Sequence, residues 1–196
     1  IAENGHISKV ELPDGSVVWL NSGSEITYSN YFAANSRDIN LSGEAYFQVT
    51  KNEDIPLVVN CGDLQVKVLG TKFNVDAYSE SHQINVVLES GKVELLNSRV
   101  ESFTYKLIPG ERATFDKNDK DLKVCNVNTL KFTSWKEGII NIYDQSLEEL
   151  ADRLETRYNQ KFEIAEEVKD LHFTFTIKNE SLDEIIKLME KITPVK

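Results

Sequence analysis

The chain has 196 residues, of which 40% are hydrophobic and 28% are charged, and its formal net charge is −10. This length is enough to bury a core in one large or two small domains. The acidic balance argues against nucleic acid and anionic lipid as partners, because phosphate groups are bound by clustered Lys and Arg. No apolar run approaches the roughly 20 residues of a membrane span, and no signal peptide is recognisable. Because the first residue is Ile1, we expect the chain to be part of a longer protein.

Short β-strands separated by tight turns are predicted for the first half of the chain. Residues 9–12, 17–20 and 25–28 are rich in β-branched and apolar side chains. Pro13–Ser16 and Asn21–Ser24 lie between them and have the composition of turns, because Pro presets φ and Gly accepts a positive φ. Further strands are predicted at residues 38–41, 56–59, 64–69, 84–88 and 122–127.

A unit in which a short strand begins near a glycine recurs four times, at residues 41–49, 68–75, 88–95 and 108–115. In the second unit, alternation predicts that Phe73 and Val75 face the core while Lys72 and Asn74 face the other way. Repetition of one supersecondary unit is typical of layers that bury a core only when stacked. We therefore predict a stacked or solenoid-like β domain over residues 1–130.

The pattern changes to strands alternating with helices after residue 130. A strand is predicted at residues 139–143, and Ser146 with Glu149 forms a capping box that begins a helix. A strand at 161–164 would complete a βαβ unit. A second strand and helix follow at 172–177 and 182–192, again with a capping box. We predict a small βαβ-βαβ domain over residues 131–196, whose second copy reaches Lys196 without its last strand.

Residues for catalysis, cofactor binding or metal binding are not recognisable in the sequence. The three histidines, His6, His82 and His172, are far apart and lack the neighbours of a local zinc site. Residues 116–121 resemble a calcium loop, but Lys120 stands where an oxygen ligand is needed. No phosphate-binding loop, dinucleotide fingerprint or nucleophile elbow occurs. We therefore expect no enzyme, no cofactor and no metal.

The cysteines and tryptophans allow more than one interpretation. Cys61 and Cys125 are best interpreted as two free small side chains, although one disulfide in an oxidising compartment remains open. Trp19 lies within a predicted strand and is expected in the core. Trp135 stands where the β pattern ends, so we expect it to pack between the two domains rather than bind a ligand.

Three motifs, in order, carry a family resemblance: Leu12–Ser24 (LPDGSVVWLNSGS), Leu41–Val49 (LSGEAYFQV) and Val68–Val75 (VLGTKFNV). They closely resemble the periplasmic part of FecR-family anti-sigma factors, and residues 88–93 and 108–111 fit the same pattern. The stretch from Thr133 onward resembles the carboxy-terminal domain of the Bacteroidetes members, which is similar to the short N-terminal domain of secretins and TonB-dependent receptors.

This resemblance implies the periplasmic region of a single-pass inner-membrane regulator. Such a region receives a signal from the periplasmic signalling domain of a TonB-dependent transporter, and it controls an extracytoplasmic-function sigma factor through a cytoplasmic segment absent from this sequence. Direct contact of this region with the membrane is not expected. The family offers no catalytic residues to transfer.

Two surfaces could receive the partner: an open sheet edge that accepts a strand, and the junction around Trp135. We name Trp135, His172, Phe173 and Phe175 as candidate partner-binding residues. A β-rich periplasmic carbohydrate-binding protein, with turns and aromatic side chains forming a shallow sugar site, is the alternative.

Overall fold

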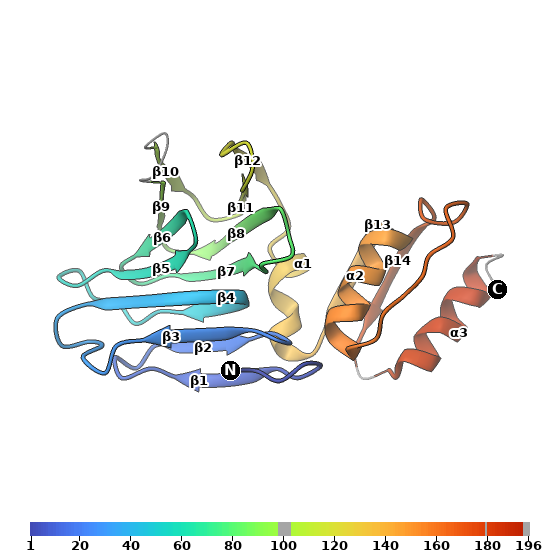
Figure 1. Cartoon of the computed structure of the whole chain (residues 1–196), viewed down its shortest axis with the longest axis horizontal. Helices are drawn as coiled ribbons and strands as arrows, with labels where there is room; N and C mark the ends of the chain where they lie inside the picture. Colours follow the sequence, from blue (N-terminus) through green and yellow to red (C-terminus); the bar gives the residue numbers. More distant parts are fainter. Residues whose placement is uncertain (98–102, 179, 194–196) are drawn as a thin grey trace.

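The computed structural model describes residues 1–97, 103–178 and 180–193. Within these residues, twelve strands between Ser8 and Asn126 stack side by side, and a smaller set of helices and strands follows (Figure 1). We call residues 8–126 the β region. Its strands are β1 (Ser8–Glu11), β2 (Val17–Leu20), β3 (Glu25–Tyr28), β4 (Arg37–Gln48), β5 (Leu57–Cys61), β6 (Leu64–Val68), β7 (Lys72–Ala77), β8 (Gln83–Ser90), β9 (Val93–Asn97), β10 (Phe103–Leu107), β11 (Glu111–Asp116) and β12 (Leu122–Asn126).

The 12-residue strand β4 belongs to both halves of the β region. Its first part pairs with β3 and, in parallel, with β5, which continues through β6 and β9 to β10. Its second part pairs with β2 and β7, which continue to β1 on one side and to β8, β11 and β12 on the other. Gly43 lies where the two sets of partners meet, with φ +93°. Strand β4 therefore belongs to two sheets at once.

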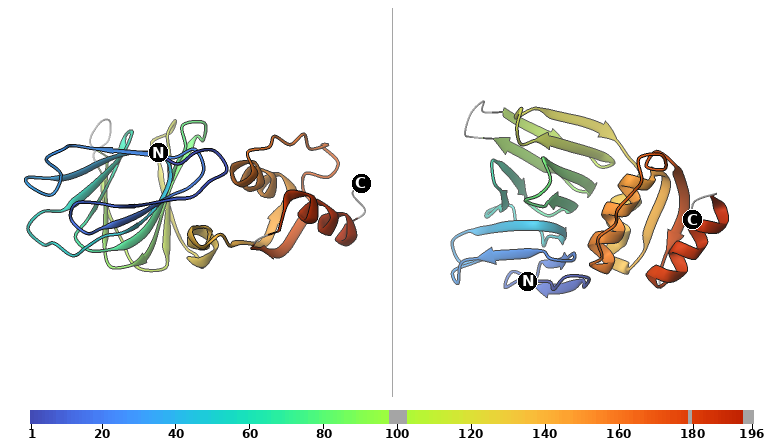
Figure 2. Two further views of the ribbon diagram at one scale, coloured as in Figure 1. Left: turned by 90° about the horizontal axis from the view of Figure 1, so that it is seen from below. Right: turned by 45° about the vertical axis from the view of Figure 1, so that its right-hand side comes forward.

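The two halves enclose one hydrophobic core, and Figure 2 shows them as two layers in the view from below. Phe103 of β10 and Phe115 of β11 lie 6.0 Å apart between ring centroids, so the two sheets are in contact. Phe47 and Phe73 stack at 4.9 Å within one half. Phe73 and Val75 are fully buried, as predicted. Each such side chain contributes roughly 1.5–3 kcal/mol by leaving water.

Asn74 shows a limit of what strand alternation can predict. The exposed fraction of its side chain is only 2%, although it faces away from Phe73 and Val75. The outer face of β7 is covered at this point by the segment around Trp135, whose indole bonds to the Asn74 side chain. Strand periodicity shows which side a residue faces, but not whether another segment covers that side.

A buried ion pair closes one end of the core. Arg37 is 1% exposed and its guanidinium lies 2.9 Å from Asp14 Oδ2. The same guanidinium donates to the carbonyl oxygens of Ile55, Thr50 and Asn52. A buried charge is tolerated when it is paired and hydrogen-bonded, and Arg37 satisfies both conditions.

Residues 140–193, which we call the C-terminal region, form a small α/β unit. The short helices α1 (Leu130–Thr133) and η1 (Ser134–Glu137) lead into it, and its elements are β13 (Ile140–Ser146), α2 (Leu147–Tyr158), β14 (His172–Ile177) and α3 (Leu182–Ile192). Both predicted capping boxes are confirmed, at Ser146 with Glu149 and at Ser181 with Glu184. A second hydrophobic cluster joins both strands to both helices.

The mainly β fold followed by a small α/β region is confirmed, but the predicted strand at Lys161–Ile164 is wrong. No strand occurs between α2 and β14, and β13 pairs with β14 in antiparallel. The Phe162 backbone N–H donates to Glu155 Oε1 at 2.8 Å, and the Phe162 ring packs on the second cluster. The Glu155 side chain therefore accepts the hydrogen bond that a neighbouring strand was expected to accept from the Phe162 backbone.

Both cysteines are free thiols, as predicted. Cys61 is buried and Cys125 is exposed. Among the described residues, no helix is long and apolar enough to span a bilayer.

Candidate functional site

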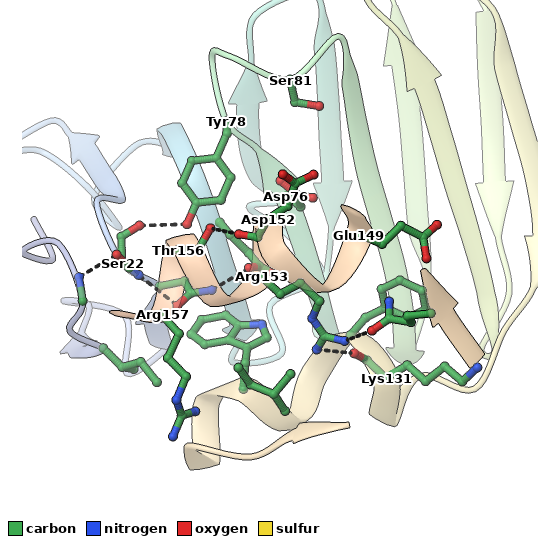
Figure 3. A pocket seen from close by; sticks show the side chains of 18 of the residues that line it. Ser22, Asp76, Tyr78, Ser81, Lys131, Glu149, Asp152, Arg153, Thr156 and Arg157 are labelled. Carbon is green, nitrogen blue, oxygen red and sulfur yellow. Dashed lines mark hydrogen bonds between the residues drawn. The ribbon is translucent and has the colours of Figure 1, made fainter. Parts of the chain in front are cut away.

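A cavity of about 550 Å³ lies between the β region and the C-terminal region (Figure 3). Strand β7 and the residue that follows it supply Asp76 and Tyr78 to one wall, and helix α2 supplies Asp152 and Arg153 to the other. Trp135 lines it from the connecting segment. We call this place the junction.

A chain of hydrogen bonds runs from the connecting segment into the β region. Trp135 is 6% exposed, and its indole Nε1 donates to Asn74 Oδ1 at 3.0 Å. Asn74 Nδ2 donates to Glu44 Oε1 at 2.8 Å, and Asn21 Nδ2 donates to Glu44 Oε2 at 2.7 Å. A carboxylate only accepts hydrogen bonds, so Glu44 holds both amides by their nitrogen atoms and leaves Asn74 Oδ1 for the indole.

Glu44 and Asp76 are directly opposite each other on the paired strands β4 and β7. Both side chains are partly buried. Burial, and then the charge of Asp76, raises the pKa of Glu44 to about 7, against the opposing effect of its amide donors and Arg153. Burial also raises the pKa of Asp76, although hydrogen bonds to the Tyr78 backbone and Asn85 oppose the rise. Like charges in this cross-strand arrangement repel.

Arg153 of α2 supplies positive charge on the other side of the junction. Its guanidinium donates to the Asn141 carbonyl at 2.9 Å, to Gln145 Oε1 at 2.7 Å and to the Lys131 carbonyl at 3.4 Å. Burial lowers the pKa of Arg153 from its ordinary value, and the neighbouring Glu44 acts in the opposite direction. Arg153 therefore ties α2 to β13 and to α1, and it faces Glu44 with a complementary charge.

The end of α2 lies beside the first residues of the chain, because Gly5 and Arg157 both line the cavity. A Cβ atom at Gly5 would lie 3.5 Å from the Arg157 carbonyl oxygen. The Gly5 backbone N–H donates to Ser22 Oγ at 2.7 Å, which holds this segment on the β region. Arg157 also donates to the Gly138 carbonyl at 2.7 Å. The junction thus has contacts on two sides of the cavity.

The four candidate partner-binding residues do not form one surface. Trp135 lies in the junction, where it packs between the two regions, and Phe173 is 3% exposed in the second hydrophobic cluster. Phe175 is partly buried and lines a shallow groove of about 300 Å³. His172 is exposed, with Nδ1 2.9 Å from Asp144 Oδ1, and this hydrogen bond raises the pKa of His172.

Sequence reasoning missed Glu44, Asp76 and Arg153. Each stands in a segment where an exposed charged residue is ordinary, and only strand pairing and the approach of α2 bring them together. Asn74 carried a weak signal, because it interrupts a buried strand with an amide. No group of metal-binding side chains occurs among the residues that the structure describes.

Comparisons with known proteins agree with this architecture. Residues 2–94 match the family model described as FecR protein, and residues 139–196 match the model described as FecR, C-terminal. Two crystal structures of a candidate anti-sigma factor from Parabacteroides distasonis ATCC 8503, at 1.65 and 2.50 Å resolution, are 29% identical to this chain. Each match covers all of this chain and 91% of the chain in the crystal structure, and the TM-scores are 0.85 and 0.84. No curated protein matches significantly. The chain belongs to the FecR family of anti-sigma factors.

Proposed function

We propose that this chain is the periplasmic, signal-receiving region of a transmembrane anti-sigma factor. It binds the periplasmic signalling domain of an outer-membrane TonB-dependent transporter. Binding controls an extracytoplasmic-function sigma factor through a cytoplasmic segment outside this sequence. Membership of the FecR family and the likeness to a candidate anti-sigma factor along the whole chain support this assignment.

The junction is the observation that carries the proposal. The β region and the C-terminal region have separate cores and meet around a cavity through a few polar contacts. A partner that binds one arrangement of the two regions more tightly shifts the population toward it. A tenfold shift needs only about 1.4 kcal/mol of differential binding.

The surface that receives the partner includes the groove beside β13 and β14. Among the described elements these strands pair only with each other, and addition of a strand from the partner is one established way to bind such a sheet. Leu130 is 59% exposed and Tyr143 is 62% exposed along the groove, and Phe175 forms part of its floor. His172 lies at the start of β14. In this arrangement Phe173 and Trp135 act by holding the strand and the junction in place.

Calorimetric titration with the purified signalling domain of a transporter encoded beside this protein tests the proposal. We expect saturable binding by the unmodified chain, and a loss of at least tenfold in affinity for Tyr143→Ala, since exposed aromatic side chains often dominate an interface. Tyr31→Ala is the matched control, because Tyr31 is 75% exposed in the β region. Absence of binding by the unmodified chain would overturn the function, whereas normal binding by Tyr143→Ala would overturn only the proposed surface.

Titration with glycans distinguishes the alternative. A change in tryptophan fluorescence on adding glycans, without any partner protein, would favour a carbohydrate-binding protein. We expect no such change.

We also propose two domains, over residues 1–130 and 131–196, and a likeness of the second to the short N-terminal domain of secretins and TonB-dependent receptors. The two hydrophobic clusters support the division. Limited proteolysis should cut first near residues 126–130. Initial cleavage within α2 or β13 would contradict the boundary.

A further inference from the structure

Two carboxylates face the junction from neighbouring strands. Glu44 and Asp76 are in direct register on β4 and β7, and both line the cavity under α2. Two ionised carboxylates in such a position repel each other, and the cost rises when water is removed from around them. Closing the C-terminal region over this pair removes water, so the charge of the pair and the closure of the junction are linked.

The charges that face the pair come from every neighbouring element. Arg153 approaches from α2, where Asp152 and Glu149 also line the cavity. Lys117 follows β11 and acts on Asp76, and its Nζ donates to the Tyr78 carbonyl at 2.7 Å. Arg112 of β11, Lys131 and Arg157 also line the cavity. Arg153 and Lys117 also bond to other groups, so they compensate the pair only in part.

The pair is also joined directly to the contact that closes the junction. Glu44 accepts from Asn74, and Asn74 accepts from the Trp135 indole. A movement of the Glu44 carboxylate that breaks its hydrogen bond with Asn74 therefore releases the amide that holds Trp135.

We propose that the junction is a pH-sensitive contact, closed when the Glu44–Asp76 pair carries a proton and loosened when both carboxylates are ionised. This property goes beyond signal reception and needs no partner. The pKa of Glu44, about 7 in the closed junction, places the change near neutral pH. An acid whose pKa is raised on closure makes the closed state bind more protons, so closure is favoured at low pH and weakens as pH rises through 7.

The size of the effect follows from the pKa change. If the rise from 4.5 to about 7 comes entirely from closure, the closing equilibrium falls by roughly tenfold between about pH 6 and about pH 8. Any part of the pKa rise of Glu44 that comes from burial within the β region alone makes the change in the closing equilibrium smaller than tenfold.

Hydrogen exchange of the Trp135 indole N–H, followed by NMR, measures the junction directly. The chain has two tryptophans, so Trp19 is an internal reference, and Trp19→Phe assigns the two signals. We expect the protection factor of Trp135, corrected for the intrinsic exchange rate, to fall by up to about tenfold between about pH 6 and about pH 8. The protection of Trp19 should not follow this change. A protection factor of Trp135 that is independent of pH would overturn the proposal.

Variants of the pair identify the groups responsible. Asp76→Asn should keep Trp135 protected at about pH 8 and remove most of its pH dependence. Glu44→Gln removes the same titration, but it sets an amide nitrogen against the amide of Asn21 or Asn74, so for this variant only the loss of pH dependence is expected. Asp54→Asn is the matched control, because Asp54 is exposed in a loop of the β region. Backbone amide spectra report whether each variant is folded. A full tenfold pH dependence in either folded variant would overturn the assignment to this pair.

Discussion

The indole of Trp135 and the side-chain amide of Asn74 are joined by a hydrogen bond of 3.0 Å between residues 61 positions apart in the sequence. Trp135 stands on the connecting segment and Asn74 on the outer face of β7. This bond attaches the connecting segment to the outer face of β7.

Replacing Trp135 with Phe keeps an aromatic ring but leaves Asn74 Oδ1 without its donor. We expect the free energy of unfolding to fall by about 1–3 kcal/mol, because a buried polar atom loses its partner. Urea denaturation measures the change. In a double-mutant cycle with Asn74→Val, the two losses should not add, and strictly additive losses would show that the bond contributes nothing.

Gly43→Ala should destabilise the protein more than Gly110→Ala, although the two glycines have nearly the same φ. A Cβ atom at Gly43 would lie 2.4 Å from Ser24 Oγ and 2.9 Å from Ser24 Cα, at a φ of +93°. Gly110 has a φ of +92° and open space around its Cβ position. We expect a loss of roughly 1–2 kcal/mol for Gly110→Ala, from backbone strain alone, and roughly 1–3 kcal/mol more for Gly43→Ala. Equal losses in thermal unfolding would exclude a steric role for Ser24.

Arg37→Met should be among the most destabilising single substitutions in the β region. It removes the partner of Asp14 and leaves three carbonyl oxygens without their donor. Breaking a buried ion pair costs about 3–5 kcal/mol. Lys51→Met is the control, since Lys51 is 75% exposed in its pair with Glu53, and it should change stability by less than about 0.5 kcal/mol. A loss below about 1 kcal/mol for Arg37→Met, by urea denaturation, would contradict this prediction.

The two cysteines should differ sharply in reactivity. Burial raises the pKa of Cys61 to about 12, so its reactive thiolate is scarce at pH 8, whereas Cys125 is exposed. A chromogenic disulfide reagent should modify one thiol per folded chain and two after denaturation. Cys125→Ser should abolish the fast reaction, and fast modification that persists in this variant would contradict the assignment.

Local chemistry made several elements predictable from the sequence. The capping boxes at Ser146 and Ser181 depend on residues three positions apart, and both helices begin there. Phe73 and Val75 face the core because alternation is a property of the strand itself. At Lys161–Ile164 the same reasoning failed, since a strand also needs a neighbour to bond with, and Glu155 binds the Phe162 backbone instead.

The sequence by itself determined most of the strands, the two capped helices, the family and the absence of recognisable catalytic motifs, because these depend on short-range patterns. Only the tertiary structure decided that β4 serves two sheets, that Asn74 is buried, and that Glu44 and Asp76 meet beneath α2. The reason is physical: burial and charge repulsion depend on which distant segments come together, and residues 44, 76 and 153 share no sequence spacing that would reveal it.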